Sequence, residues 1–98
     1  MSGTAKQINV VFEQELNRSA AYIDGKHVGE CEFTIDGSVW SITHTGVDQA
    51  YSGRGIAKML VLKVIEEVRN RQVRINPICS YAKRVMEGNE EFSDVLNK

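Results

Sequence analysis

The stretch Val47-Asp-Gln-Ala-Tyr-Ser-Gly-Arg-Gly-Ile-Ala-Lys58 lies where the hydrophobic pattern of the chain changes its period. Before it, apolar and polar residues alternate, which is typical of half-buried strands. After it, apolar residues recur every four positions, at Ile56, Leu60, Val64 and Val68. That spacing indicates an amphipathic helix, which we expect from near Gly53 to Asn70. The stretch is therefore a glycine-containing loop between a strand and a long helix.

Four extended segments precede this loop. Alternating residues indicate strands at 8–12, 16–23, 28–35 and 39–47, and Asp24-Gly25 and Asp36-Gly37 are typical hairpin turns. In the last strand the alternation places four residues on one face, namely Trp40, Ile42, His44 and Gly46. The first half of the chain is therefore predicted to be an antiparallel meander.

Three shorter elements follow the helix. Residues 73–76 read as a strand that Pro77 ends, and residues 80–87 read as a helix that stops at Gly88. The tail is expected to add a short helical turn that packs Phe92, Val95 and Leu96. Residues 1–98 are thus predicted to form a single α/β domain, in which a strand meander is followed by helix, strand and helix.

Composition narrows the classes of protein that this chain can represent. A hydrophobic fraction of 42% and a charged fraction of 26% argue against disorder and coiled coil. A net charge of -1 argues against bulk attraction to nucleic acid or to a membrane. The basic residues Arg69, Arg71 and Arg74 have no interleaved aromatic residues and suit the C-terminal end of the helix. No segment resembles an export signal, so we expect a cytoplasmic protein without a membrane span.

The two cysteines are too few for a disulfide framework, and no Cys or His spacing is typical of a metal site. We therefore expect free thiols and no metal. Cys31 falls on the apolar face of its strand with Phe33 and is expected to pack in the core.

The glycine loop is suited to binding an anion. The first backbone N–H groups of a helix have no intrahelical acceptor, and glycines allow a ligand to approach them closely. A pyrophosphate fits such a site, although two glycines at this spacing more often serve only to shape a strand-to-helix turn. The Walker pattern is absent, and Lys58 stands where a dinucleotide-binding motif has its third glycine. Nucleoside triphosphate hydrolysis and dinucleotide binding are therefore disfavoured.

The segment Ser52-Gly-Arg-Gly-Ile-Ala-Lys-Met-Leu60, after the strand Ser41-Ile-Thr-His-Thr-Gly-Val47, resembles motif A of the GCN5-related N-acetyltransferase (GNAT) superfamily. That motif reads Arg/Gln-x-x-Gly-x-Gly/Ala. Gly53 and Gly55 match it, whereas Ala50 stands at the Arg/Gln position and Gln49 lies one residue before. The resemblance extends over residues 7–87. It is closest to a small bacterial subgroup that shares the segment Asn76-Pro-Ile-Cys-Ser-Tyr81.

The resemblance implies a minimal GNAT-like fold with a short parallel strand, and acetyl-CoA or coenzyme A as cofactor. It implies that the amides of Gly53 to Lys58 bind the pyrophosphate and that the strand edge near His44 to Val47 binds the pantetheine arm. Arg54 and Lys58 would add charge near the phosphates, or else are ordinary solvated residues. The implied cofactor residues are Thr45, Gly46, Val47, Ser52, Gly53, Arg54, Gly55, Ile56, Ala57, Lys58, Asn76 and Cys79.

Cys79 immediately precedes the second predicted helix. A helix N-terminus favours the thiolate of such a cysteine, and Lys83 and Arg84 act in the same direction. The subgroup places this cysteine near the acetyl group, so it is a candidate nucleophile, with packing as the alternative. His44 is a candidate base, although a single histidine is more often structural. Tyr81 is a candidate general acid for direct transfer, with packing again as the alternative.

The resemblance implies an acetyl-CoA-dependent acyltransferase acting on an unidentified amine or thiol. The alternatives are a CoA-binding protein without robust transfer and a small interaction module that has lost the ligand. Usual members place helices between their first two strands and add a strand pair at the end, and these parts help to form the acceptor site. Here about ten residues follow Gly88, so cofactor binding is predicted more strongly than catalysis. The sequence specifies neither the acceptor nor the oligomeric state.

Overall fold

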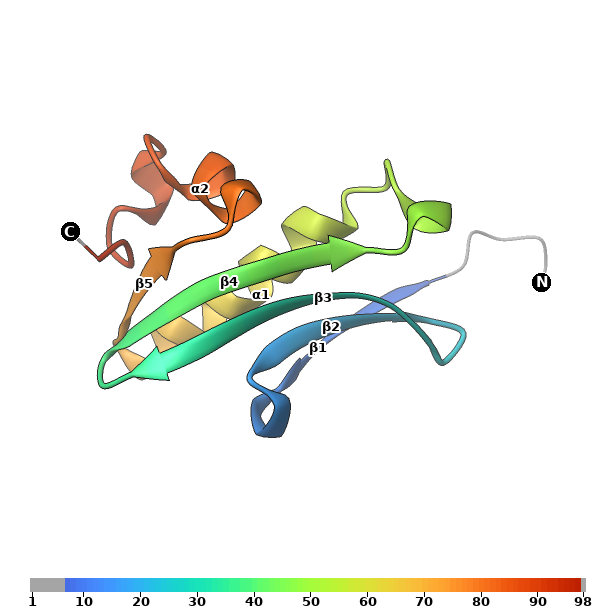
Figure 1. The fold of residues 1–98 in the computed structure, drawn as a ribbon, viewed down its shortest axis with the longest axis horizontal. Helices are drawn as coiled ribbons and strands as arrows, with labels where there is room; N and C mark the ends of the chain where they lie inside the picture. Colours follow the sequence, from blue (N-terminus) through green and yellow to red (C-terminus); the bar gives the residue numbers. More distant parts are fainter. Residues whose placement is uncertain (1–6, 98) are drawn as a thin grey trace.

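The computed structural model describes residues 7–97, which form one five-stranded sheet with helices on one side (Figure 1). Strands β1 to β4 are antiparallel in chain order, and β5 pairs with β4 in parallel. The elements are β1 (Ile8–Glu13), η1 (Gln14–Leu16), β2 (Arg18–Ile23), β3 (Lys26–Asp36), β4 (Val39–Val47), η2 (Gln49–Tyr51), α1 (Ile56–Arg71), β5 (Arg74–Pro77), α2 (Ser80–Met86) and η3 (Glu90–Phe92). The predicted fold class and order of elements are confirmed.

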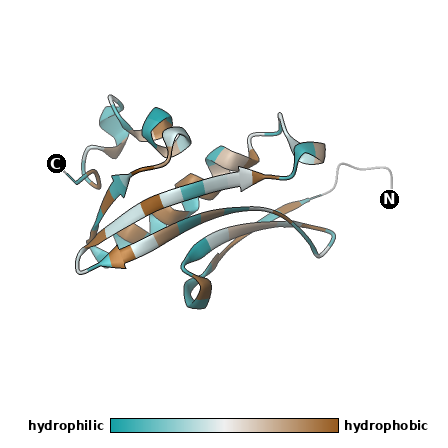
Figure 2. Cartoon of the chain, viewed as in Figure 1, coloured by the Kyte–Doolittle hydropathy of each residue, from teal (hydrophilic) through white to brown (hydrophobic). Residues whose placement is uncertain are grey.

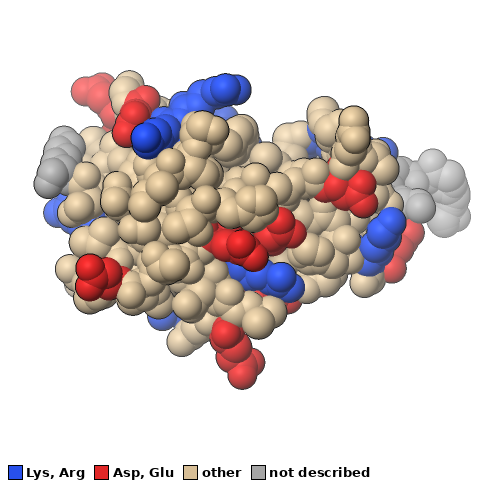
Figure 3. Space-filling model, viewed as in Figure 1, with Lys and Arg blue, Asp and Glu red and all other residues tan. Residues whose placement is uncertain are grey.

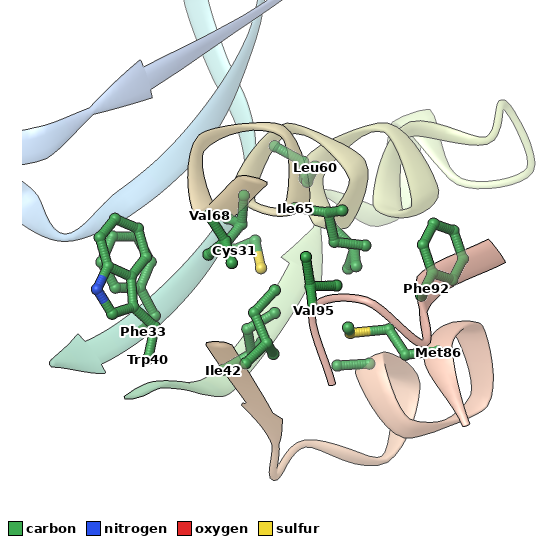
Figure 4. Packing of buried hydrophobic residues seen from close by; sticks show 14 of the residues in the cluster. Cys31, Phe33, Trp40, Ile42, Leu60, Ile65, Val68, Met86, Phe92 and Val95 are labelled. Carbon is green, nitrogen blue, oxygen red and sulfur yellow. The ribbon is translucent and has the colours of Figure 1, made fainter. Parts of the chain in front are cut away.

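The hydrophobic core lies between one face of the sheet and the helices. Hydrophobic and hydrophilic residues alternate along β4 and around α1 (Figure 2). The sheet contributes side chains such as Ile42, which meet the buried stripe of α1 at Leu60 and Val68 (Figure 4). Met86 of α2 and Phe92 of the tail join the same cluster. The predicted packing of the tail is confirmed, and Leu96 also forms a parallel bridge to Ile75.

The opposite face of the sheet has no helix over it among the described residues. It faces the viewer in Figures 1 and 3, where β3 and β4 pass in front of α1. Asp and Glu side chains gather near the middle of this view (Figure 3). Glu30 and Glu32 of β3 and His44 of β4 are polar residues of this face. We refer to it below as the uncovered face.

A bulge in β4 reverses the pattern that alternation predicts. Glu32 pairs with His44 but Phe33 pairs with Ile42, so Thr43 is an extra residue without a partner in β3. Beyond such a bulge the side chains change faces. The prediction that His44 shares a face with Ile42 is therefore wrong, because Thr45 takes that position and His44 is exposed on the uncovered face.

An ion pair at the β1–β2 hairpin gives a pH-dependent contribution to stability. Arg18 Nε and the Tyr22 hydroxyl each donate to the Glu13 carboxylate over 2.6 Å. The Tyr22 hydrogen bond, followed by Arg18, lowers the pKa of Glu13 below its ordinary value of 4.5. A carboxyl with a lowered pKa stabilises the fold above its unfolded pKa, and that stabilisation is lost as the pH falls through the folded pKa.

When the pH is lowered from about 6 to about 3, the free energy of unfolding of a Glu13→Gln variant should therefore fall less than that of the native chain. The pair is partly exposed, so we expect a difference of about 1 kcal/mol or less. Urea unfolding at both pH values measures it. Equal losses in the two proteins would show that Glu13 does not contribute in this way.

Candidate functional site

The glycine loop has a backbone that only glycine adopts readily. Gly53 and Gly55 have φ angles of +80° and +78°, in the left-handed region that L side chains rarely occupy. A Cβ atom added at either position would meet nothing within 4 Å. The glycines therefore shape the turn, and they also leave open space directly in front of it.

Helix α1 begins at Ile56, three residues later than predicted, because Gly55 is its left-handed N-terminal cap. The amide of Met59 donates to the carbonyl of Gly55 over 3.2 Å. The amides of Ile56, Ala57 and Lys58 precede that first bond and have no acceptor within the helix. Together with the helix dipole, these amides form a site with a preference for anions.

Strand β4 has a free edge next to this loop. β5 pairs with β4 only over Val39–Ile42, and the amides of Ile78 and Cys79 then both donate to the carbonyl of Ile42. Beyond that point the two segments diverge, as Figure 1 shows. Within the described part of the chain, the stretch from His44 to Val47 therefore has a strand partner on its β3 side only. An extended ligand can pair with the other side by backbone hydrogen bonds.

A cavity of about 250 Å³ joins the loop, the free edge and helix α2. Its lining residues are Val47, Tyr51, Ser52, Gly53, Gly55, Ile56, Ala57 and Tyr81. The structure thus brings Tyr81 next to the glycine loop, a position that its candidate role as general acid requires. Burial raises the pKa of the Tyr81 hydroxyl, so that it keeps its proton at neutral pH.

Cys79 is the N-terminal cap of α2 and is half-buried. Its Sγ accepts a hydrogen bond from the amide of Ala82 over 3.3 Å and lies 3.5 Å from Thr45 Oγ1. The same hydroxyl lies 3.5 Å from Sγ of Cys31. Cys31 is fully buried, which confirms its predicted place in the core, and burial raises its pKa to about 12.

His44 lies on the other side of the strand. Its Nε2 is 2.9 Å from Glu30 Oε2, and Nε2 of His27 is 3.3 Å from Glu30 Oε1. These contacts lie on the uncovered face, whereas Thr45 turns toward Cys79. The structure does not bring His44 alongside Cys79, because the bulge at Thr43 places their side chains on opposite faces.

Two further residues that the sequence implied stand apart from the cavity. Asn76 lies in the paired part of β5 opposite Ser41 and is exposed, between the buried Ile75 and Pro77. Lys58 is exposed on the first turn of α1 and does not line the cavity. Arg54 is exposed in the loop itself. Apart from Cys79 at the start of α2, the remaining implied cofactor residues lie on the loop, the start of α1 or the free edge of β4.

Tyr51 and Lys26 were not identified from the sequence. Tyr51 lines the cavity, and its ring centre is 5.4 Å from Cζ of Arg54 and 5.7 Å from Nζ of Lys26. Lys26 comes from the start of β3, far along the chain, so no local pattern links it to the loop. The position of Tyr51 inside the loop was the available signal. The positive charges of Lys26 and Arg54 thus lie beside a loop whose backbone amides also favour anions.

Residues 7–97 contain no group of three His, Cys, Asp or Glu side chains arranged to hold a metal ion. No helix in the same range is long and apolar enough to cross a membrane.

Comparison with models of known protein families shows which family this chain belongs to. The family model described as GCN5-related N-acetyl-transferase matches residues 18–95. The chain belongs to this family. The match covers β2 through the tail, including the glycine loop and Cys79, so the resemblance read from residues 52–60 and 76–81 is confirmed. Among curated proteins, none matches the chain significantly.

Several solved structures of N-acetyltransferases share the fold. A GCN5-like putative N-acetyltransferase from Staphylococcus aureus is 27% identical with a TM-score of 0.69, and the match covers 93% of this chain and 87% of that protein. The GNAT family N-acetyltransferase YhbS from Escherichia coli, in complex with CoA, is 14% identical with a TM-score of 0.70, covering 87% of this chain and 69% of that one. An N-acetyltransferase from Thermoplasma acidophilum, in complex with coenzyme A, is 15% identical with a TM-score of 0.59, covering 76% and 43%. The last two similarities concern the fold alone.

Proposed function

We propose that the protein binds acetyl-CoA and transfers the acetyl group to an amine or thiol. The observation that carries this proposal is that the cavity at the glycine loop reaches Val47, from which the free edge of β4 runs back to Thr45, beside Cys79. Membership of the GCN5-related N-acetyl-transferase family supports it. The relatives from Escherichia coli and Thermoplasma acidophilum hold coenzyme A, which agrees with this ligand.

Each part of the path suits a part of acetyl-CoA. The amides that follow Gly53 carry positive dipoles and suit the pyrophosphate, with Arg54 supplying nearby charge. The backbone of β4 from Thr45 to Val47 suits the amides of the pantetheine arm. The arm then runs toward Cys79, whose half-buried sulfur suits the thioester end.

The thiolate of Cys79 attacks the thioester carbonyl carbon in this proposal. A bond forms between Cys79 Sγ and the acetyl carbon, the bond from that carbon to the CoA sulfur breaks, and Tyr81 gives its proton to the departing sulfur. The acceptor then attacks the acetyl-cysteine and restores the Cys79 sulfur. An amine acceptor gives its proton to the Tyr81 oxygen in this second step, which restores the Tyr81 hydroxyl.

A second candidate is a CoA-binding protein without robust transfer. The sulfur of Cys79 caps α2 through the Ala82 amide, and this structural role would be sufficient to explain the residue. The same path for the ligand serves both candidates, and only the fate of the acetyl group separates them.

Titration of ¹⁵N-labelled protein with acetyl-CoA tests the binding that both candidates require. Amide signals of residues 45–47, 52–58 and 81 should shift, because these residues line the proposed path. Signals of β1, at the far edge of the sheet, serve as the internal control and should stay in place. Absence of any shift at millimolar ligand would contradict both candidates.

A further inference from the structure

Two positive side chains lie over the ring of Tyr51, at the end of the sheet that carries the glycine loop. Nζ of Lys26 is 5.7 Å from the ring centre, and Cζ of Arg54 is 5.4 Å from it. Tyr51 is half-buried in η2, whereas Lys26 and Arg54 are exposed. An aromatic ring attracts cations, so Tyr51 holds two like charges near one another. We refer to these three residues as the Tyr51 cluster.

Strand register and a backbone hydrogen bond hold the Tyr51 cluster together. β3 is antiparallel to β4, and Gly29 pairs with Val47, so Lys26 at the start of β3 extends beyond the end of β4. The amide of Asp48 donates to the carbonyl of Val28 over 2.7 Å. The β2–β3 turn and the segment that follows β4 therefore lie at the same end of the sheet (Figure 1).

No carboxylate of residues 7–97 forms an ion pair with Lys26 or Arg54, although the chain has a net charge of -1. The carboxylate of Asp48, close by in the sequence, accepts a hydrogen bond from the amide of Ala50 over 3.0 Å. Two like charges repel each other, and an anion bound by both offsets that repulsion. The Tyr51 cluster is therefore suited to a group that carries more than one negative charge.

CoA carries such a group besides its pyrophosphate, namely a phosphomonoester on the ribose of its adenosine. A phosphomonoester has about two negative charges at neutral pH. In the proposed complex the pantetheine arm runs from the glycine loop along β4 toward Thr45. The adenosine end then leaves the loop in the other direction, beyond Val47, where Tyr51 and Lys26 lie.

We propose that Lys26 and Arg54, gathered at Tyr51, bind the ribose phosphomonoester of CoA and make the protein prefer CoA to dephospho-CoA, which lacks this phosphate. The inference rests on the proposed function. Both ligands share the pyrophosphate, so the difference between their affinities reports on the Tyr51 cluster. Two exposed ion pairs predict a preference of about tenfold at low salt. Because salt screens exposed charges, the preference should be smaller at about 0.5 M salt.

The test is calorimetric titration of the native chain and of Lys26→Met with CoA and with dephospho-CoA. Methionine keeps most of the apolar stem of lysine and removes the charge. We expect the affinity for CoA to fall about three- to fivefold and the affinity for dephospho-CoA to stay unchanged. Lys63→Met is the matched control, because it removes the same charge from the surface of α1, where Lys63 pairs with Glu66 over 3.1 Å. Both affinities of this control should equal the native ones.

Two further residues of the Tyr51 cluster can be tested with the same pair of ligands. Arg54 lies between Gly53 and Gly55, so Arg54→Met should weaken binding of both ligands, with the larger loss for CoA. Tyr51→Leu removes the ring that holds the cations, and it should lose more of the preference for CoA than Tyr51→Phe, which keeps a ring. Amide spectra of each variant verify that it is folded.

The outcomes separate failure of this proposal from failure of the proposed function. Equal affinities of the native chain for CoA and dephospho-CoA would overturn the phosphomonoester site and leave the proposed function standing. Equal losses for the two ligands in Lys26→Met would overturn the role of Lys26. Absence of binding by either ligand would contradict the proposed function and, with it, this inference.

Discussion

A Gly55→Ala variant is expected to bind acetyl-CoA at least about tenfold more weakly than the native chain. Gly55 has a φ of +78°, and its missing Cβ faces open space at the N-terminus of α1. In the proposed complex the pyrophosphate occupies that space, next to the amides of the first helical turn. The added methyl group would both obstruct the ligand and strain the loop whose shape presents the amides.

The strain has to be separated from the obstruction. An alanine in the left-handed region costs roughly 1–2 kcal/mol of folding stability wherever it occurs. Gly88 has a nearly equal φ of +77°, lies after α2, and also has nothing within 4 Å of its missing Cβ. Gly88→Ala is therefore the matched control, with a similar fall in melting temperature and unchanged affinity.

Calorimetric titration and thermal unfolding of both variants give the comparison. A fall in melting temperature of about 4–15 °C is expected for each, from the usual relation between stability and melting temperature in chains of this size. Only Gly55→Ala should lose affinity. If both variants bind acetyl-CoA as tightly as the native chain, the glycine loop does not form the phosphate site.

The sequence predicts the parts of this site that depend on local patterns. The change of period at residues 47–58 locates the loop and the helix. The sequence also supplies glycine at the two loop positions that have a left-handed backbone in the structure, Gly53 and Gly55. Cys79 is identified because a cysteine directly before a predicted helix is a local feature too. These inferences need no knowledge of which strands are neighbours.

The parts that the sequence misses depend on tertiary structure. A bulge adds one residue without any sequence marker at Thr43, and every side chain after it changes face. Alternation therefore predicts the wrong face for His44, and it does not predict that the Thr45 hydroxyl lies beside the sulfurs of Cys31 and Cys79. Lys26 reaches Tyr51 only because the start of β3 lies near the loop. Such neighbours follow from register and strand order, which alternation alone does not specify.

The largest effect is expected for Cys79→Ala, which should abolish labelling of the protein by acetyl-CoA. After incubation with acetyl-CoA the native chain should gain the mass of one acetyl group, because its sulfur retains the acetyl group as a thioester. Cys31→Ala should still gain it at the end point, since Cys31 is fully buried and keeps its proton. Neutral hydroxylamine cleaves a thioester but not an amide, so it should remove the label.

The outcome of this experiment decides between the routes by which the acetyl group can leave CoA. Equal, hydroxylamine-resistant labelling of native chain and Cys79→Ala would place the acetyl group on an amine and contradict a thioester at Cys79. Absence of label together with release of CoA when an amine is added would indicate direct transfer. Tyr81 would then remain the proton donor, since it lines the cavity of the glycine loop and burial raises its pKa. A Tyr81→Phe variant should slow CoA release by about tenfold or more in either route, because both require a proton at the departing sulfur.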